Sequence, residues 1–216
     1  MGTKSIKKVL FSMAVPAITA QIINLLYNLV DRMYIGHIPE VGATALTAVG
    51  VTMPIIMVIS AFAALVSMGG APRSSIMMGK GDKDAAEKIL GNCTTALVLI
   101  SVTLTAVVLI FGEKMLMAFG ASENTIKYAL DYLNIYAFGT LFVQLALGLN
   151  AFITAQGFAK TSMLTVLVGA ILNIILDPIF IFGFNMGVKG AALATIISQG
   201  VSALWVIKFL IGDKTL

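Results

Sequence analysis

Long apolar segments alternate with short polar or glycine-rich stretches along the chain. A helix rises about 1.5 Å per residue, so a bilayer core of roughly 30 Å requires about 20 apolar residues. Transmembrane helices are therefore predicted at approximately 9–35, 45–68, 89–111, 126–155, 162–184 and 188–211. The connections between them are expected at 36–42, 69–88, 112–125, 156–161 and 185–187. This pattern predicts an all-α integral membrane bundle of six transmembrane helices forming one domain over residues 1–216.

Composition supports lipid as the main solvent of the chain. Hydrophobic residues occupy 59% of the 216 positions and charged residues 11%, whereas a soluble globular chain carries roughly 25% charged residues. The single Cys93 excludes an internal disulfide, and the single His37 leaves structural zinc and c-type haem unsupported. We therefore expect no cofactor of these kinds.

The distribution of lysine and arginine predicts the orientation, because basic residues accumulate in short cytoplasmic loops. Six crossings place both termini on one side of the membrane. That side carries Lys4, Lys7, Lys8, Arg73, Lys80, Lys83, Lys88, Lys160, Lys208 and Lys214. The other side carries Arg32, Lys114, Lys127 and Lys189. Both termini are therefore expected in the cytoplasm, and the net charge of +4 requires no nucleic-acid partner.

The strongly charged stretch 79–88, GKGDKDAAEK, does not have the spacing of a phosphate-binding loop. Such a loop needs GxxxxGK[ST] between a strand and a helix. We interpret the stretch as a solvated cytoplasmic turn. Uphill transport would then be driven by an ion gradient or by a separate subunit.

Two acids, Asp31 and Asp177, lie inside predicted membrane helices. An acid at the bilayer centre costs about 2.5–3.5 kcal/mol on insertion scales, and such residues usually face a cavity and carry function. Structural explanations also exist: Asp31 is close to a helix end beside Arg32, and Asp177 could balance a buried hydrogen-bond network. Position along the helices favours function, because Asp31, Asp177 and Thr195 all fall about 8–12 Å below the same predicted boundary.

Other polar residues extend this layer at helical spacing. They are Asn24 and Tyr27 on the face of Asp31, Asn173 one turn from Asp177, and Gln199 one turn from Thr195. Carboxylate, amide and hydroxyl oxygens suit a sodium ion, and the carboxylates can instead take a proton; the sequence does not choose between the two ions. Pro16 and Pro178 each free a backbone carbonyl in the helices that carry the acids, so both mark candidate bends.

Three motifs resemble the N-terminal lobe of the multidrug and toxic compound extrusion (MATE) family, in its bacterial multidrug-exporter branch. They are VDRMYIG at 30–36, NIILDP at 173–178 and KGAALAT at 189–195, with GLNAFITAQG around Asn150 also fitting. The resemblance implies a cation site between helices one, five and six that contains Asp31, Asn173, Asp177 and Thr195. Tyr27, Asn24, Asn150 and Gln199 are expected to support that site.

The resemblance also implies a function and a location. The expected function is antiport in a bacterial cytoplasmic membrane. The coupling ion is H⁺ or Na⁺, and sodium would bind at Asp31 and Asp177. Binding would bend helix one near Pro16 and lead to expulsion of a cationic amphipathic compound. Family members have about twelve helices in two lobes with the substrate cavity between them. This chain matches one lobe, so a C-terminal lobe or a second copy is the expected partner, and the chain is either a fragment or a self-assembling half.

Two other functions compete with this one. Lipid-linked oligosaccharide flippases of the same superfamily line their cavity with arginines that meet a pyrophosphate, but Arg32 and Arg73 are both predicted in loops or at helix ends. An intramembrane enzyme would need a nucleophile with a base, or paired acids holding a metal. His37 lies in a predicted loop and no GxSG or DDxxD pattern occurs, so we expect no enzyme.

Overall fold

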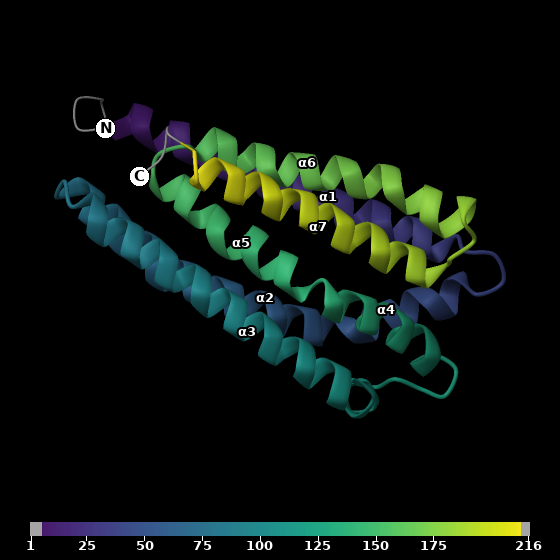
Figure 1. The fold of residues 1–216 in the computed structure, drawn as a ribbon. Helices are drawn as coiled ribbons and strands as arrows, with labels where there is room; N and C mark the ends of the chain where they lie inside the picture. The colour runs from purple at the N-terminus through teal and green to yellow at the C-terminus, as the bar shows by residue number, and fades with distance from the viewer. Residues whose placement is uncertain (1–5, 213–216) are drawn as a thin grey trace.

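The structure is a computed structural model that describes residues 6–212, all in helices and short turns (Figure 1). The elements are α1 (Ile6–Gly36), α2 (Gly42–Gly79), α3 (Lys83–Ala118), α4 (Ile126–Phe138), α5 (Thr140–Ala155), α6 (Ala159–Pro178), the π-helix η1 (Ile179–Gly183) and α7 (Val188–Leu210). Lys4 and Lys214 of the predicted cytoplasmic set lie outside the described residues, as does the side chain of Lys8.

The all-α membrane bundle is confirmed. Within the described residues five helical segments are long and apolar enough to cross a membrane, namely α1, α2, α3, α6 with η1, and α7. The pair α4 and α5 makes a sixth if it is counted as one span, although its two halves are bent by 58°. The prediction of one helix over 126–155 is therefore wrong, because the chain breaks at Gly139.

The break at Gly139 allows α7 to approach closely. A Cβ atom built on Gly139 would overlap Ile196 of α7, lying 2.6 Å from its Cβ. Beside the break, the hydroxyl of Thr105 on α3 donates to the carbonyl of Ala137 in the last turn of α4, at 2.9 Å. A carbonyl near the end of α4 is thus satisfied by a neighbouring helix, as a helix end inside a bilayer requires.

The connection predicted between the second and third membrane helices is much shorter than expected. Residues 69–88 were predicted as a loop, but α2 continues to Gly79 and α3 begins at Lys83. The turn uses a positive φ of 81° at Gly81, and the Asp82 side chain accepts from the amide of Ala85 at 3.0 Å to cap α3. Hydrophobicity locates the membrane-buried part of a helix, so it misses polar turns that continue into water.

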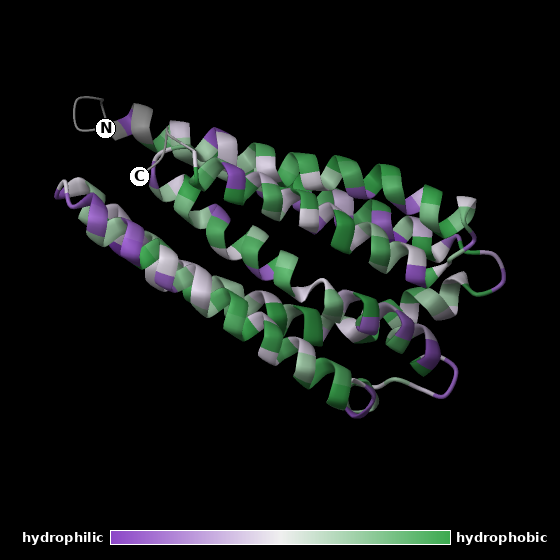
Figure 2. Cartoon of the chain, viewed as in Figure 1, coloured by the Kyte–Doolittle hydropathy of each residue, from purple (hydrophilic) through white to green (hydrophobic). Residues whose placement is uncertain are grey.

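The helices pack around two apolar clusters, one toward each end of the bundle. One includes Ile35, Ala45 and Leu133, and the other includes Leu97 and Phe152. Helix α1 packs mainly on α6, α2 packs on α3 and α5, and α7 contacts α4, α5 and α6. Figure 2 shows hydrophobic residues along most of the helices and hydrophilic residues gathered toward the two ends, as expected for a bundle surrounded by lipid.

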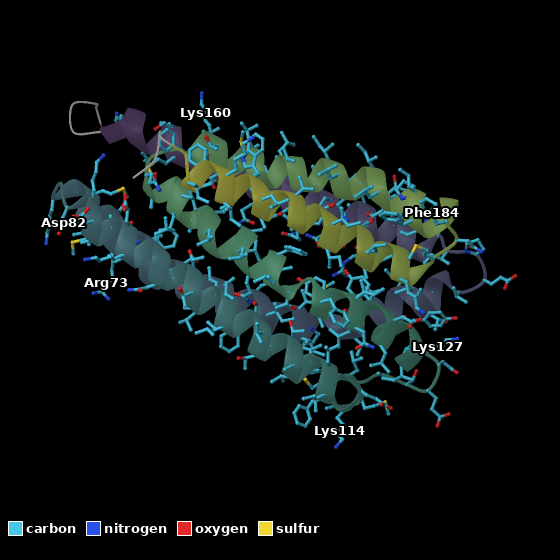
Figure 3. The ribbon with its side chains drawn as sticks, in the orientation of Figure 1. Arg73, Asp82, Lys114, Lys127, Lys160 and Phe184 are labelled. Carbon is cyan, nitrogen blue, oxygen red and sulfur yellow. The ribbon has the colours of Figure 1, made fainter. Side chains whose placement is uncertain are left out.

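The charged residues separate toward the two ends of the bundle. Figure 3 places Arg73, Asp82 and Lys160 at one end and Lys114 and Lys127 at the other. The start of α1, the α2–α3 turn, the α5–α6 turn and the end of α7 all lie at the first end (Figure 1). We call it the lysine-rich end. The described helices therefore alternate in direction as predicted.

A methyl group at Gly139 tests the role of this break. We expect Gly139→Ala to destabilise the protein by about 1–3 kcal/mol, because Ile196 must move to accept the added carbon. Gly91→Ala on α3 is the matched control, since Gly91 is exposed and a Cβ there meets no atom within 4 Å. Thermal unfolding in detergent measures both, and equal midpoints for the two variants would contradict the packing role.

Candidate cation-binding site

Two carboxyl groups meet where α1 packs along α6. Asp31 of α1 is 7% exposed and Asp177 of α6 is fully buried at 0%. The two side chains interact directly, and the exposed Arg32 adds an attraction to Asp31 from the next position in the chain. Buried acids at close range repel one another when both are ionised. The pair is therefore suited to hold a positive charge.

Asn173 connects this pair to α7. Its Nδ2 donates to Asp177 Oδ1 at 3.2 Å and lies 3.5 Å from Thr195 Oγ1. The hydroxyl of Thr195 in turn donates to the carbonyl of Ala191 at 3.0 Å. The structure thus brings Asp31, Asn173, Asp177 and Thr195 together from three helices.

Three oxygens of this cluster have no hydrogen-bond partner. They are Asp31 Oδ1, Asn173 Oδ1 and Asp177 Oδ2, each buried. Carboxylate and amide oxygens are ligands for hard cations, and a carboxylate oxygen can instead take a proton. The chemistry of these donors is therefore compatible with a sodium ion or with a proton.

Small residues at the start of α7 allow the cluster to form. A Cβ atom on Gly190 would lie 2.7 Å from the carbonyl carbon of Phe180 and 2.8 Å from the amide of Ile181. Ala191 and Ala194 next to it are fully buried. The close approach brings Thr195 to Asn173. Small residues commonly permit such contacts between membrane helices.

The π-helix η1 follows directly from Pro178. Proline cannot donate to the helical ladder, and the backbone after it adopts wider π-helical turns over Ile179–Gly183. The helix type therefore changes at Pro178, and the bend predicted there stays a prediction. Pro16 is buried within α1, which continues through it as one helix. Its bending role stays a prediction.

The supporting residues lie around a cavity of about 40 Å³ between α1, α5, α6 and α7. Asn24, Tyr27, Asn150 and Gln199 all line it, together with Asn173 and Thr195. Tyr27 is close enough to both acids to interact with their charges. Asn150 lines the cavity from α5, and its Nδ2 donates to the carbonyl of Ser162 at 3.3 Å.

Tyr132 of α4 belongs to the same neighbourhood, and sequence reasoning did not identify it. Its ring is 3% exposed and its hydroxyl interacts with Thr195 and with the charge of Asp31. The ion pair between Asp131 and Lys189, at 3.3 Å, joins this part of α4 to the first turn of α7. A tyrosine in an apolar helix carries no sequence signal that separates it from a core residue.

The arginines lie away from the buried interior. Arg32 and Arg73, the two arginines of the chain, are both exposed. A pyrophosphate inside the membrane would be bound most strongly by buried arginine forks. The described residues of this lobe supply none.

Comparison with known proteins identifies the family. The MatE family profile matches residues 16–179. Multidrug export protein MepA of Staphylococcus haemolyticus (strain JCSC1435) is 30% identical over 203 residues, which cover 94% of this chain and 44% of MepA. The chain thus spans about half the length of the curated relatives it matches.

Solved structures agree with this match. Crystal structures of MATE in the bent and in the straight conformation are both 28% identical to this chain, with TM-scores of 0.89 and 0.88. Each comparison covers 97% of this chain and 46% of the solved one. The chain belongs to the MATE family of multidrug efflux transporters, and the match is consistent with one six-helix lobe of that fold.

Proposed function

We propose that this chain is the cation-coupling, N-terminal lobe of an antiporter that exports cationic amphipathic compounds. A proton or a sodium ion binds at Asp31, Asn173, Asp177 and Thr195 and drives the export. The observation that carries the proposal is the meeting of two buried acids with three unpartnered oxygens. The name of the relative MepA, a multidrug export protein, supports export of drugs.

Coupling follows from where the acids lie. Asp31 is on α1 and Asp177 is on α6, and α1 packs mainly on α6. An empty pair repels across this contact, whereas a bound cation removes the repulsion. Cation binding therefore changes the free energy of the α1–α6 contact, and we place the resulting bend of α1 at or near Pro16.

The two conformations that coupling requires can have similar overall folds. A MATE protein solved in a bent and in a straight conformation resembles this chain almost equally, with TM-scores of 0.89 and 0.88. A shift between states a few kcal/mol apart requires a ligand that binds one state better than the other. A cation held between two helices meets this requirement.

The partner of this lobe is a second lobe, either a C-terminal one or another copy of the chain. The chain covers 44% of MepA, so about half of that transporter's length has no counterpart in it. We place the substrate cavity between the two lobes. The exposed position of both arginines favours a cationic substrate over a lipid-linked pyrophosphate.

Neutralising either acid tests the coupling. In the transporter expressed from its complete gene, Asp31→Asn and Asp177→Asn should each reduce ethidium export to background, because asparagine mimics the protonated acid and cannot cycle. Unfolding midpoints should change by less than about 4 °C, because the shift per kcal/mol becomes smaller as a chain becomes longer. Asp84→Asn, at an exposed acid in the first turn of α3, is the control and should export normally. Normal export by either variant, in both proton and sodium gradients, would remove that residue from the mechanism.

Ligand-dependent stability tests the site without transport. A cation that binds only the folded protein raises its stability by about 2.7 kcal/mol at one hundred times its dissociation constant. We expect the unfolding midpoint of the purified transporter to rise with sodium at constant ionic strength, or with a lower pH if the proton is the ligand. Asp177→Asn should abolish the rise and Asp84→Asn should retain it. A midpoint that responds to neither ion would contradict the site.

Labelling from outside intact cells tests the orientation. In a Cys93→Ala background, Lys127→Cys should react with an impermeant maleimide, and Lys83→Cys should react only after the membrane is permeabilised. Both positions are exposed and lie at opposite ends of the bundle, and the lysine-rich end should face the cytoplasm. The reverse pattern would overturn the assigned topology.

A further inference from the structure

Most of the unpartnered buried polar atoms follow one course through the bundle. Among the described residues seven such atoms occur. Five of them belong to the acid pair or to residues that line the cavity next to it, namely Asp31 Oδ1, Asp177 Oδ2, Asn173 Oδ1, Ser198 Oγ and Asn150 Oδ1. The other two are on Gln156 and on Gln144, whose Nε2 donates across to the carbonyl of Ile59 on α2 at 2.7 Å. Buried polar atoms without partners are rare, and water or an ion often satisfies them.

The cavity of about 40 Å³ lies along this course. Asn173 and Thr195 line its part nearest the acids, and Thr165 and Ser202 line its far part. Thr165 lies eight residues before Asn173 on α6, so these lining residues span about 12 Å along the helix. A volume of this kind holds about three water molecules, since one needs roughly 10–15 Å³.

The facing surfaces of α6 and α7 are polar over this length. Ser198 and Ser202 follow Thr195 along α7, opposite Thr165 and Gly169 of α6. A Cβ atom on Gly169 would come within 2.5 Å of Ser202 Oγ, so glycine leaves the cavity its width.

Ser198 differs from the other hydroxyl groups of this surface. Thr165 donates to the carbonyl of Thr161 at 3.2 Å, and Ser202 is 3.4 Å from the carbonyl of Thr165. Ser198 Oγ has no protein partner and is buried, with the residue 3% exposed. An oxygen in this position can bind a water molecule or a cation inside the cavity.

The course continues toward the lysine-rich end. Asn150 lines the cavity five residues before the end of α5, and its unpartnered Oδ1 is available there. Thr165 and Ser202 line the cavity at this end as well. Polar groups without protein partners therefore extend from the acid pair as far as Asn150, in the second half of α5.

We propose that this cavity is a hydrated path through the lobe, along which the coupling cation moves between the acid pair and the lysine-rich end, with Ser198 and Asn150 as oxygen ligands on the way. The proposal rests on the proposed function, because it needs a cation that binds at Asp31 and Asp177. It adds a route inside a single lobe, separate from the substrate cavity between lobes. The alternative is a closed cavity that holds only structural water.

Removing the Ser198 hydroxyl tests the path. Ser198→Val should slow export about tenfold, the effect of losing roughly one hydrogen bond at a barrier. The midpoint of cation-dependent stabilisation should stay unchanged, because the acid pair is intact. Ser101→Val is the matched control: Ser101 on α3 is 1% exposed and lies away from the cavity, where its hydroxyl donates to the carbonyl of Val98 at 2.7 Å. Export at the control rate by Ser198→Val would overturn the proposal.

Access by a small cation gives a second and independent readout. Silver ion is a monovalent cation that reacts with thiols, so Ser198→Cys in the Cys93→Ala background reports whether such an ion reaches the cavity. The assay uses vesicles of known orientation, with silver added at the lysine-rich face. Silver should inhibit export by Ser198→Cys before it has any effect on export by the control variant Ser101→Cys. Inhibition at the rate of the control shows a closed cavity, and inhibition only from the opposite face shows that the cavity opens the other way. Either result overturns the path. The variants at Asp31 and Asp177 test cation coupling separately. If the path proposal fails, the result of those two variants still decides whether the acids couple a cation to export.

Discussion

The contact between Asp31 and Asp177 is the interaction on which the rest of this lobe depends. It joins α1 to α6, and α6 is the main neighbour of α1 among the described helices. Two ionised acids weaken this attachment, whereas a shared cation strengthens it. In the function proposed above, chemistry at two side chains would therefore influence how a helix of 31 residues is held.

Close packing of α7 makes this contact usable. In a bilayer apolar burial does not drive helices together, so small residues that permit close approach take over that role. Gly190 lies against the backbone of η1, and Gly169 faces Ser202. The same small side chains leave space beside Asn173 and Thr195. The packing of α7 and the cavity beside it consequently depend on the same positions.

Sequence reasoning located the spans and the acid layer because both follow from helix rise and hydrophobicity. It could also anticipate that Asp31, Asn173, Asp177 and Thr195 share one depth, and the structure brings them together. The break at Gly139 could not be predicted, since it depends on Ile196, which is distant in sequence. Tyr132 and Ser198 likewise depend on the rotation of α4 and α7 about their axes, which apolar helices do not encode clearly.

The break at Gly139 also separates two mechanical units. On one side α4 is tied to the start of α7 by the Asp131–Lys189 ion pair, and on the other α5 is tied to α2 through Gln144 and Ile59. The 58° bend interrupts the continuous rod that would otherwise transmit force along this span. Helix α4 also packs on α2 and α3, where Thr105 is bonded to Ala137, so a displacement of α4 near the acids would pass sideways to the α2–α3 hairpin. It would not pass straight along the axis into α5, because the bend separates the two helices.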